Sequence, residues 1–261
     1  MSRYRRWNDL LELLAAAGQL QIEDAAKALN VSEATVRRDF DELARQQMLT
    51  RIRGGAVAQA VNYDLPLRYK SERHPSEKRR IGELAASMVT VGQVVGLNGG
   101  TTTTEVARGL AIRPNLSRAG TEPAVTVVTN ALNIATELAV RQHIKIVATG
   151  GVARPQSYEL TGPLANDTLE RVTLDVAFLG VDGIDAVAGA TAHNEGEASI
   201  NQLMARQARK VIIVADSSKI GRRAFARICG PAEIDVLVTD TGIAAEDVAL
   251  LEAGGIDVVT A

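Results

Sequence analysis

From about residue 76 to the C-terminus, short runs rich in Val and Ile alternate with segments in which apolar residues recur at helical spacing. Strands that are apolar at every position are typical of parallel sheets covered by helices on both faces. Strands are predicted at Val94–Leu97, Val125–Thr129, Ile144–Thr149, Val176–Val181, Val211–Ala215, Val236–Thr239 and Asp257–Val259. Helices are expected near 102–111, 131–140, 164–170, 194–208 and 245–253, after a first helix capped by Ser76. The alternation predicts an α/β domain with a mainly parallel sheet.

Five of the predicted strand ends carry glycines or polar residues, and ligands of such sheets bind beyond the carboxyl ends of the strands. The first end leads into a helix and reads Asn98, Gly99, Gly100, Thr101, Thr102, Thr103. Glycines allow close backbone approach and a helix N-terminus offers unpaired N–H groups, so the loop suits a phosphate. It is neither a Walker A loop nor a GxGxxG. The alternative is a threonine that only caps the helix on a Gly-rich turn.

The other strand ends extend this predicted site. They contribute Thr129, Asn130, Gly150, Gly151, Asp182 and Lys219, and a nearby helix opens with Glu195 and Glu197. Asn130 and Asp182 can bond sugar hydroxyls, while Lys219 can pair with a phosphate or with a carboxylate of the site. Each residue alone is more often a turn residue than a ligand contact. Their joint placement at one sheet edge predicts a site for a phosphorylated sugar.

The first 58 residues show a different pattern, with three short helical segments in succession. Their apolar positions are Trp7, Leu10, Leu11 and Leu14, then Ile22, Ala25, Ala26 and Leu29, then Val36, Phe40 and Leu43. Ser32 is a good N-cap for the third helix, expected from Ser32 to Gln46. Two helices joined by a tight turn, with Arg37 and Arg38 on the outer side of the second, are typical of a helix-turn-helix. Three ordinary packing helices with solvated arginines are the alternative.

A β-hairpin is predicted after the third helix, around a Gly-Gly turn at Gly54 and Gly55. Beside a recognition helix it would act as a wing that lays Arg51 and Arg53 against the DNA backbone or minor groove. The predicted DNA contacts are Arg3, Ser32, Thr35, Arg37, Arg38, Arg51, Arg53 and Gly54.

The run Val31–Leu43, VSEATVRRDFDEL, resembles the VS-x-x-T-(I/V)-RRDL-x-x-L signature of the DeoR family of bacterial transcriptional regulators. The hairpin is similar to that family's R-x-x-GGA wing, and the strand ends are similar to its D-x-GTT, TN, GG, G-x-x-G and D-x-S-K-x-G patterns. The resemblance spans about Tyr4 to Asp240. It implies a winged helix-turn-helix followed by an effector domain resembling sugar-phosphate isomerases. Asn98 stands where the family usually has Asp, which could change the group that is read.

The amino-acid composition excludes several other classes of protein. The chain has 29 Lys and Arg against 31 Asp and Glu, a net charge of −2, which excludes an extended basic, non-specific nucleic-acid binder but not a local basic face. A single cysteine excludes an internal disulfide and a Cys metal cluster, and the three histidines lack metal-site spacing. No apolar run is long enough for a bilayer. The expectation is a cytoplasmic protein without metal, cofactor or membrane contact.

The resulting prediction is a DNA-binding domain at 1–58, a linker at 59–75 and an effector domain at 76–261. We expect a sequence-specific repressor of carbohydrate metabolism genes that binds double-stranded operator DNA as a homodimer or homotetramer and is released by a phosphorylated sugar or a related metabolite. An activator is one alternative. The other is an active isomerase using Asp182, Glu195 and Lys219, although Val187–Thr191 stands where resembling ribose-phosphate isomerases carry a Lys-rich Gly loop.

Overall fold

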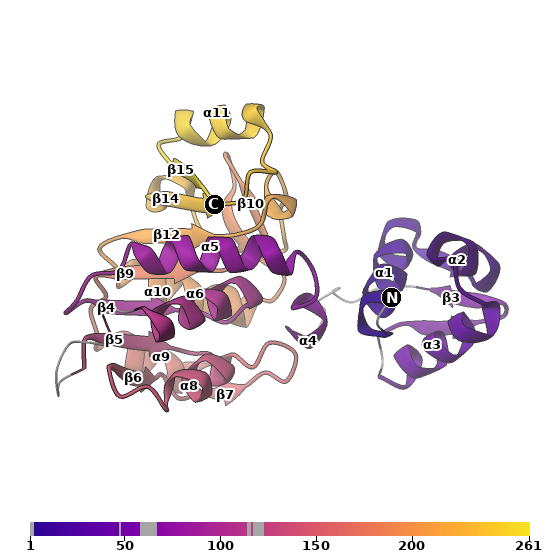
Figure 1. Cartoon of the computed structure of the whole chain (residues 1–261), viewed down its shortest axis with the longest axis horizontal. Helices are drawn as coiled ribbons and strands as arrows, with labels where there is room; N and C mark the ends of the chain where they lie inside the picture. The colour runs from indigo at the N-terminus through magenta and orange to yellow at the C-terminus, as the bar shows by residue number, and fades with distance from the viewer. Residues whose placement is uncertain (1–2, 47, 58–66, 114–115, 117–122) are drawn as a thin grey trace. The chain divides into compact units, whose positions relative to one another are not determined.

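The computed structural model describes residues 3–46, 48–57, 67–113, 116 and 123–261 of the chain (Figure 1). These residues form two compact units, divided between Arg73 and His74. The predicted linker at 59–75 spans this division. Its residues 59–66 lie outside the described residues, and Leu67–Lys70 forms the short helix α4.

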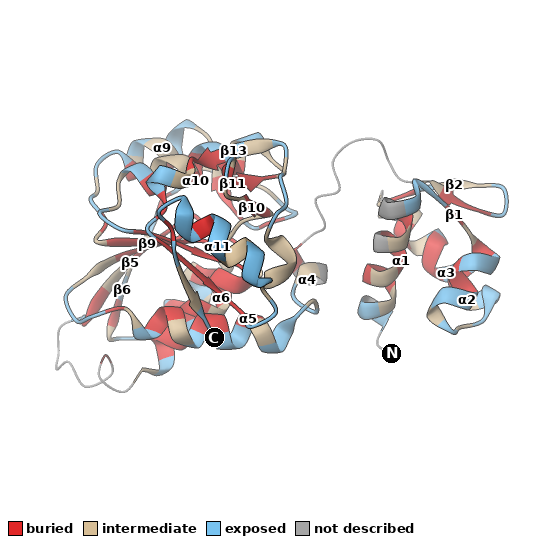
Figure 2. Cartoon of the chain, turned by 90° about the horizontal axis from the view of Figure 1, so that it is seen from above, coloured by how far each residue is buried: buried red, intermediate tan, exposed pale blue. Residues whose placement is uncertain are grey.

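Apart from α4, the described residues of the N-terminal unit form three helices and a small antiparallel sheet. The helices are α1 (Arg3–Ala17), α2 (Ile22–Leu29) and α3 (Glu33–Arg45), and the strands are β1 (Gln19–Gln21), β2 (Thr50–Ile52) and β3 (Gly55–Val57), in the order β1-β3-β2. Buried side chains line the inner faces of α1 and α3 (Figure 2), among them Trp7, Leu10, Leu14, Phe40 and Leu43. The helices and the hairpin are confirmed, whereas β1 had no sequence signal because it is three residues long.

Two local features set the geometry of the helix-turn-helix. Asn30 ends α2 in the left-handed conformation, with a φ of 52°. Ser32 caps α3, and its hydroxyl accepts a hydrogen bond from the Thr35 N–H at 3.2 Å. The predicted turn of the wing is corrected by one residue. Ile52 pairs with Gly55, so Arg53 and Gly54 form the turn and Gly55 is already in β3.

The C-terminal unit is built on a seven-stranded sheet in the order β15-β14-β12-β9-β4-β5-β6, and every neighbouring pair is parallel. The strands are β4 (Val94–Leu97), β5 (Val125–Thr129), β6 (Ile144–Ala148), β9 (Val176–Leu179), β12 (Val211–Val214), β14 (Val236–Thr239) and β15 (Asp257–Thr260). The predicted parallel sheet is confirmed strand by strand.

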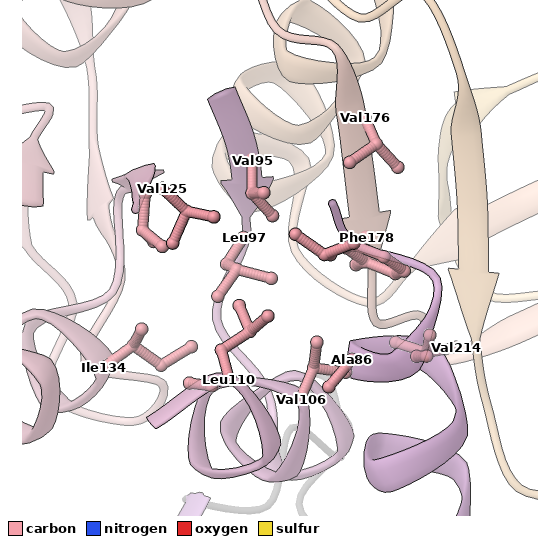
Figure 3. Close-up of a cluster of buried hydrophobic side chains, with 14 of the residues drawn as sticks. Ala86, Val95, Leu97, Val106, Leu110, Val125, Ile134, Val176, Phe178 and Val214 are labelled. Atoms are coloured by element: carbon pink, nitrogen blue, oxygen red, sulfur yellow. The ribbon is translucent and has the colours of Figure 1, made fainter. Parts of the chain in front are cut away.

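Helices cover both faces of this sheet, as Figure 2 shows. They are α5 (Pro75–Ser87), α6 (Thr101–Ile112), α8 (Leu132–Leu138), α9 (Pro163–Leu169), α10 (Glu195–Arg206) and α11 (Ala245–Ala253). Alternate strand residues enter two separate cores. Val95, Leu97, Val176 and Phe178 pack on the side of α5 and α6 (Figure 3), while Ala177 and Leu179 face α10 on the other side. Burial on both faces explains the continuous apolar runs.

Helix α5 begins one residue before the predicted cap. Pro75 occupies the first turn and His74 is the N-cap, without a side-chain bond, while the Ser76 hydroxyl donates to Glu77. Proline suits this position because the first helical residues need no N–H donor.

Two small antiparallel sheets are formed by segments that follow strands of the large sheet. They are the hairpin of β7 (Val152–Ala153) with β8 (Leu160–Thr161), and the antiparallel sheet of β10 (Gly183–Asp185), β11 (Gly189–Ala192) and β13 (Ala226–Cys229). None of them was predicted, because they lack the continuous Val- and Ile-rich runs that indicated the strands of the large sheet.

Helices α5 and α6 pack closely through glycines. A Cβ atom on Gly82 would lie 2.5 Å from the Glu105 carbonyl carbon, and one on Gly109 would lie 2.7 Å from the Ala86 Cβ. Backbone atoms of a packed helix cannot yield as a flexible side chain can.

We therefore expect Gly82→Ala to lower the free energy of unfolding of the C-terminal unit by roughly 1–3 kcal/mol, as overpacking does. Chemical unfolding followed by circular dichroism measures the change. Ser87→Ala, on the exposed side of the same helix, is the control and should stay within about 0.5 kcal/mol of the parent. Equal stability of Gly82→Ala and the parent would contradict the close packing.

Candidate functional site

The outer side of α3 presents the predicted DNA contacts. Arg37 and Arg38 are exposed, and Arg37 lies 3.4 Å from Glu33 in an exposed ion pair. Arg38 makes no hydrogen bond or ion pair with the described residues. The hydroxyls of Ser32 and Thr35 lie 2.9 Å apart at the start of the helix. This end of α3 therefore offers cationic and hydroxyl groups at the position where a recognition helix meets base edges.

The guanidinium of Arg51, a predicted DNA contact, is engaged within the domain. Its Nε donates to Asp41 at 2.9 Å and its Nη1 donates to the Gly55 carbonyl at 2.7 Å. Its guanidinium also lies 5.5 Å from the centre of the Phe40 ring. Arg51 thus ties the wing to α3, which weighs against a direct DNA contact. Arg53, beside Gly54 in the turn, is exposed.

A buried carboxylate joins α3 to α1. Asp39 is 4% exposed, and its Oδ1 accepts from the Trp7 indole at 2.6 Å and from Arg6 Nη2 at 3.0 Å. The hydrogen bond to Asp39 raises the pKa of the Arg6 guanidinium. The Arg3 guanidinium lies 4.9 Å from the centre of the Trp7 ring. Sequence reasoning missed this cluster, although an aspartate three residues after the inward-facing Val36 was a signal that it needed buried partners.

In the C-terminal unit, β4 and β9 are neighbouring parallel strands, and the strands that follow each of them are added toward opposite edges of the sheet. From β4 the chain moves to β5 and β6 on one side, and from β9 it moves to β12 and β14 on the other. The carboxyl ends of two such strands flank the crevice in which open parallel sheets bind ligands. The loop at residues 98–100 leaves β4 at this point.

Asn98 directly follows β4, and its side chain bonds the backbone after β9. Its side chain is buried, its Nδ2 donates to the Gly180 carbonyl at 2.9 Å, and its Oδ1 accepts from the Gly180 N–H at 2.8 Å. The amide thus holds the ends of β4 and β9 together, and the predicted contact between Asn98 and an effector stays a prediction. This pairing also explains why β9 ends at Leu179, before the predicted Val181, because Gly180 bonds a side chain instead of a strand.

The loop after Asn98 leads into the N-terminus of α6. Gly100 is its N-cap, with a φ of 145° and no capping side chain. Thr103 is fully buried and its hydroxyl donates to the Gly100 carbonyl at 3.2 Å, while its predicted role as a donor to the ligand stays a prediction. Thr101 is half-buried and Thr102 is buried. What the loop can offer a ligand is its backbone N–H groups and the hydroxyls of these two threonines.

The ends of β5 and β6 are also used within the protein. The Thr129 hydroxyl accepts from the Ala131 N–H at 3.1 Å. Gly150 and Gly151 have φ values of 73° and 118°, and a Cβ on Gly151 would lie 2.8 Å from the Thr161 carbonyl oxygen. Gly151 thus allows the chain to pack against β8, and its predicted contact with a ligand stays a prediction.

The carboxylates predicted after β9 differ in accessibility. Asp182 is half-buried and accepts from the His193 N–H at 3.0 Å. Glu195 is exposed, whereas Glu197 is buried and pairs with Arg154 at 2.8 Å. The structure brings Asp182 to the β9 end of the crevice and commits Glu197 to an ion pair.

Lys219 lies half-exposed in the 3₁₀ turn Ser217–Lys219 after β12. Asp240, at the end of β14, holds this turn through bonds from the Ser217 N–H and hydroxyl, at 2.7 and 2.9 Å. Burial disfavours the charged form of Asp240, but hydrogen bonds from Ser217 and Gly242 outweigh it and lower its pKa. The turn that Asp240 holds thus places the ammonium group of Lys219 after the carboxyl end of β12.

Hairpin β7–β8 brings two charged residues that the sequence analysis did not single out, Arg154 and Glu159. Glu159 is 3% exposed, and its Oε2 accepts from Asn130 Nδ2 at 2.9 Å. A Cβ on Gly99 would lie 2.2 Å from Glu159 Cγ, so the carboxylate side chain packs directly against the glycine loop. Their short strands carried no signal that would have placed them at this edge.

Other classes of site find no support in the described part of the chain. It contains no group of three or more His, Cys, Asp and Glu that could hold a metal. None of the helices described has the length and apolar character needed to cross a membrane. Cys229 is buried, and desolvation raises the pKa of its thiol to about 12.

A helix-turn-helix followed by an α/β domain with polar residues at the carboxyl ends of its parallel strands is the arrangement of a ligand-responsive DNA-binding regulator. A family model described as the DeoR-like helix-turn-helix domain matches residues 6–60, and one described as the DeoR C terminal sensor domain matches residues 73–241. The chain belongs to the DeoR family of transcriptional regulators, as its sequence motifs predict, and the family is one of regulators rather than enzymes.

Curated relatives match over most of their length. The chain is 35% identical to the HTH-type transcriptional regulator GlpR of Haloferax volcanii, covering 96% of this chain and 94% of that protein. It is 33% identical to the HTH-type transcriptional repressor GlcR of Bacillus subtilis, covering 88% and 86%. It is 29% identical to the glycerol-3-phosphate regulon repressor of Escherichia coli, covering 92% of each.

Solved structures show more distant likeness. Ribose 5-phosphate isomerase A from Neisseria gonorrhoeae is 19% identical with a TM-score of 0.40, over 56% of this chain and 53% of that one. The sorbitol operon regulator SorC from Klebsiella pneumoniae is 16% identical with a TM-score of 0.41, over 96% and 99%.

The Asp39 cluster makes a prediction for the N-terminal unit. Asp39→Ala leaves Arg6 and the Trp7 indole without their acceptor, so the free energy of unfolding of this unit should fall by roughly 3 kcal/mol. Trp7 is the chain's single tryptophan, and its fluorescence in denaturant reports this unit alone. Asp24→Ala, an exposed carboxylate on α2, is the matched control. An unfolding midpoint that is the same for both variants would exclude a stabilising role for Asp39.

The Asn98 pairing makes a second prediction. Asn98→Asp removes the donor to the Gly180 carbonyl and sets a carboxylate against that oxygen. We expect a loss of about 1–3 kcal/mol in the stability of the C-terminal unit, measured by chemical unfolding. Asn166→Asp makes the same exchange on α9, where the side chain has no bond to the described residues, and should be nearly neutral. If Asn98→Asp is equally neutral, the pairing does not hold the two strand ends.

Proposed function

We propose that the chain is a transcriptional repressor of carbohydrate genes, released from its operator by a phosphorylated sugar or polyol. The observation that carries the proposal is the N-terminus of α6, which follows the carboxyl end of β4 beside β9 through Gly99 and Gly100. A helix N-terminus combines unpaired N–H groups with the positive end of the helix dipole, which favours a phosphate. The names of two relatives, a glycerol-3-phosphate regulon repressor and the repressor GlcR, support the sign of regulation and a phosphorylated metabolite.

The proposed effector contacts are fewer than the sequence predicted. The anion would meet the backbone at Gly99, Gly100, Thr101 and Thr102, with Lys219 as the cation and Asp182 as a hydroxyl acceptor. The proposed DNA contacts are Arg38 and Arg37 on α3, Ser32 and Thr35 at its start, Arg53 and Gly54 in the wing, and Arg3 of α1. One helix-turn-helix has limited affinity, so a homodimer or homotetramer would bind half-sites about 34 Å, or a multiple, apart.

Repression would be relieved by linkage between the two sites. Effector binding must favour an arrangement of the DNA-binding units that does not fit the operator spacing. A typical coupling of about 1–3 kcal/mol corresponds to roughly a 5–150-fold change in operator affinity.

The DNA half of the proposal is tested by Arg38→Ala. We expect operator affinity, measured by fluorescence anisotropy, to fall about tenfold or more, because an exposed guanidinium on a recognition helix contacts a base or a phosphate. A loss confined to the operator indicates a base contact, and an equal loss on random DNA indicates a phosphate contact. Arg209→Ala removes the same charge from an exposed position of the C-terminal unit and serves as the control. Unchanged operator affinity of Arg38→Ala would refute the assignment of α3.

The effector half is tested by Lys219→Ala in the full chain. The variant should bind operator DNA as the parent does, yet require at least tenfold more ligand for release, since a charge-assisted bond to phosphate is lost. Glycerol 3-phosphate, fructose 6-phosphate and glucose 6-phosphate are the probes, screened first by thermal shift. A variant released at the parent's ligand concentration would remove Lys219 from the site.

A further inference from the structure

Asn130 has a buried acceptor whose orientation is fixed by its neighbours. Its side chain is fully buried at the end of β5, and its Nδ2 donates to Glu159 Oε2 at 2.9 Å and to the Leu160 carbonyl at 3.3 Å. Both partners are acceptors, so the amide cannot flip without losing both bonds. Its Oδ1 has no donor among the described residues. A buried acceptor without a donor is costly, which makes it a ready partner for a hydroxyl group.

Glu159 places a carboxylate beside this acceptor and against the glycine loop. It is buried, it bonds Asn130, and its Cγ and Oε1 would lie 2.2 and 2.5 Å from a Cβ on Gly99. A carboxylate attracts hydroxyl donors and repels an anion. The glycine loop and the Glu159–Asn130 pair are thus next to each other but suited to opposite chemistries.

The hairpin that carries Glu159 is anchored at several points. Arg154 donates to the buried Glu197 of α10 at 2.8 Å. Leu160 N–H donates to the Asn130 carbonyl at 2.6 Å, and the Leu132 N–H donates to the Tyr158 carbonyl at 3.0 Å. The hairpin segment that carries Glu159 is therefore held by bonds to α10, to the start of α8 and to Asn130 after β5, and Glu159 itself bonds Asn130, so its carboxylate has a fixed position, as a specificity residue must.

We propose that Glu159 and Asn130 form a hydroxyl-reading subsite, which selects polyhydroxylated phosphates over inorganic phosphate and over acidic phosphorylated metabolites. Glu159 accepts from one hydroxyl of the ligand, and Asn130 Oδ1 accepts from another. The proposal rests on the proposed effector site and adds the part of it that distinguishes one phosphate ester from another.

The test compares ligands by the ratio of their dissociation constants, measured by calorimetry on the full chain. The probes are inorganic phosphate, glycerol 3-phosphate, glucitol 6-phosphate and 3-phosphoglycerate, the last carrying a carboxylate. In the parent, the best phosphorylated polyol should bind at least tenfold more tightly than inorganic phosphate and than 3-phosphoglycerate.

Glu159→Gln keeps the size of the side chain and a carbonyl for Asn130 while removing the charge. The preference for the polyol phosphate over inorganic phosphate should fall roughly tenfold or more, with affinity for inorganic phosphate held or raised. Gly99→Ala, which pushes the Glu159 side chain away by contact alone, should lower the same ratio. Glu170→Gln, exposed at the end of α9, is the control for charge.

The outcomes separate the two proposals. An unchanged ratio in Glu159→Gln overturns the hydroxyl-reading subsite and leaves the phosphate site in place. A parallel loss of all ligands would make Glu159 a purely structural residue and also overturns the subsite. If no probe containing phosphate binds the parent, the proposed effector class itself fails.

Discussion

The parallel pairing of β4 with both β5 and β9 is the constraint on which the C-terminal unit depends. It places β4 beside β9, from which the chain continues toward opposite edges of the sheet, and open parallel sheets bind ligands beyond the carboxyl ends of two such strands. Asn98 joins these two strand ends with two bonds to the Gly180 backbone and fixes the distance between them. An amide suits this task because it donates and accepts at once, which a carboxylate cannot do.

In the N-terminal unit, a single carboxylate has a comparable role. Asp39 is the third residue of the Arg-Arg-Asp motif, and it points inward to Arg6 and Trp7 of α1 while Arg37 and Arg38 point outward. Arg51 then joins the wing to the same helix through Asp41 and Gly55. The charged residues in and near α3 therefore have two roles. Asp39 and Arg51 hold the helix in position, while Arg37 and Arg38 are exposed on its surface.

Much of the fold could be predicted from the sequence because the apolar residues that form the cores of the two units recur at regular spacing. Apolar runs such as Val94–Leu97 and the Ser32 cap follow from periodicity and local hydrogen bonding, and both are confirmed. The roles of single polar residues were harder to predict. Asn98, Gly151 and Arg51 lie where the motifs place them. Each, however, bonds or packs against a residue outside its own motif, namely Gly180, Thr161 and Asp41 respectively. Glu159 and Arg154 were missed because hairpin β7–β8 is too short to leave a pattern.

The most direct test of the account measures both sites together in the full chain. A phosphorylated polyol that raises the melting temperature is titrated against operator-bound and free protein, and operator affinity is measured with and without that ligand. The account predicts that the ligand weakens operator binding roughly 5–150-fold and that operator DNA weakens ligand binding by the same factor, since linkage is reciprocal. A ligand that binds the C-terminal unit and leaves operator affinity unchanged would contradict it.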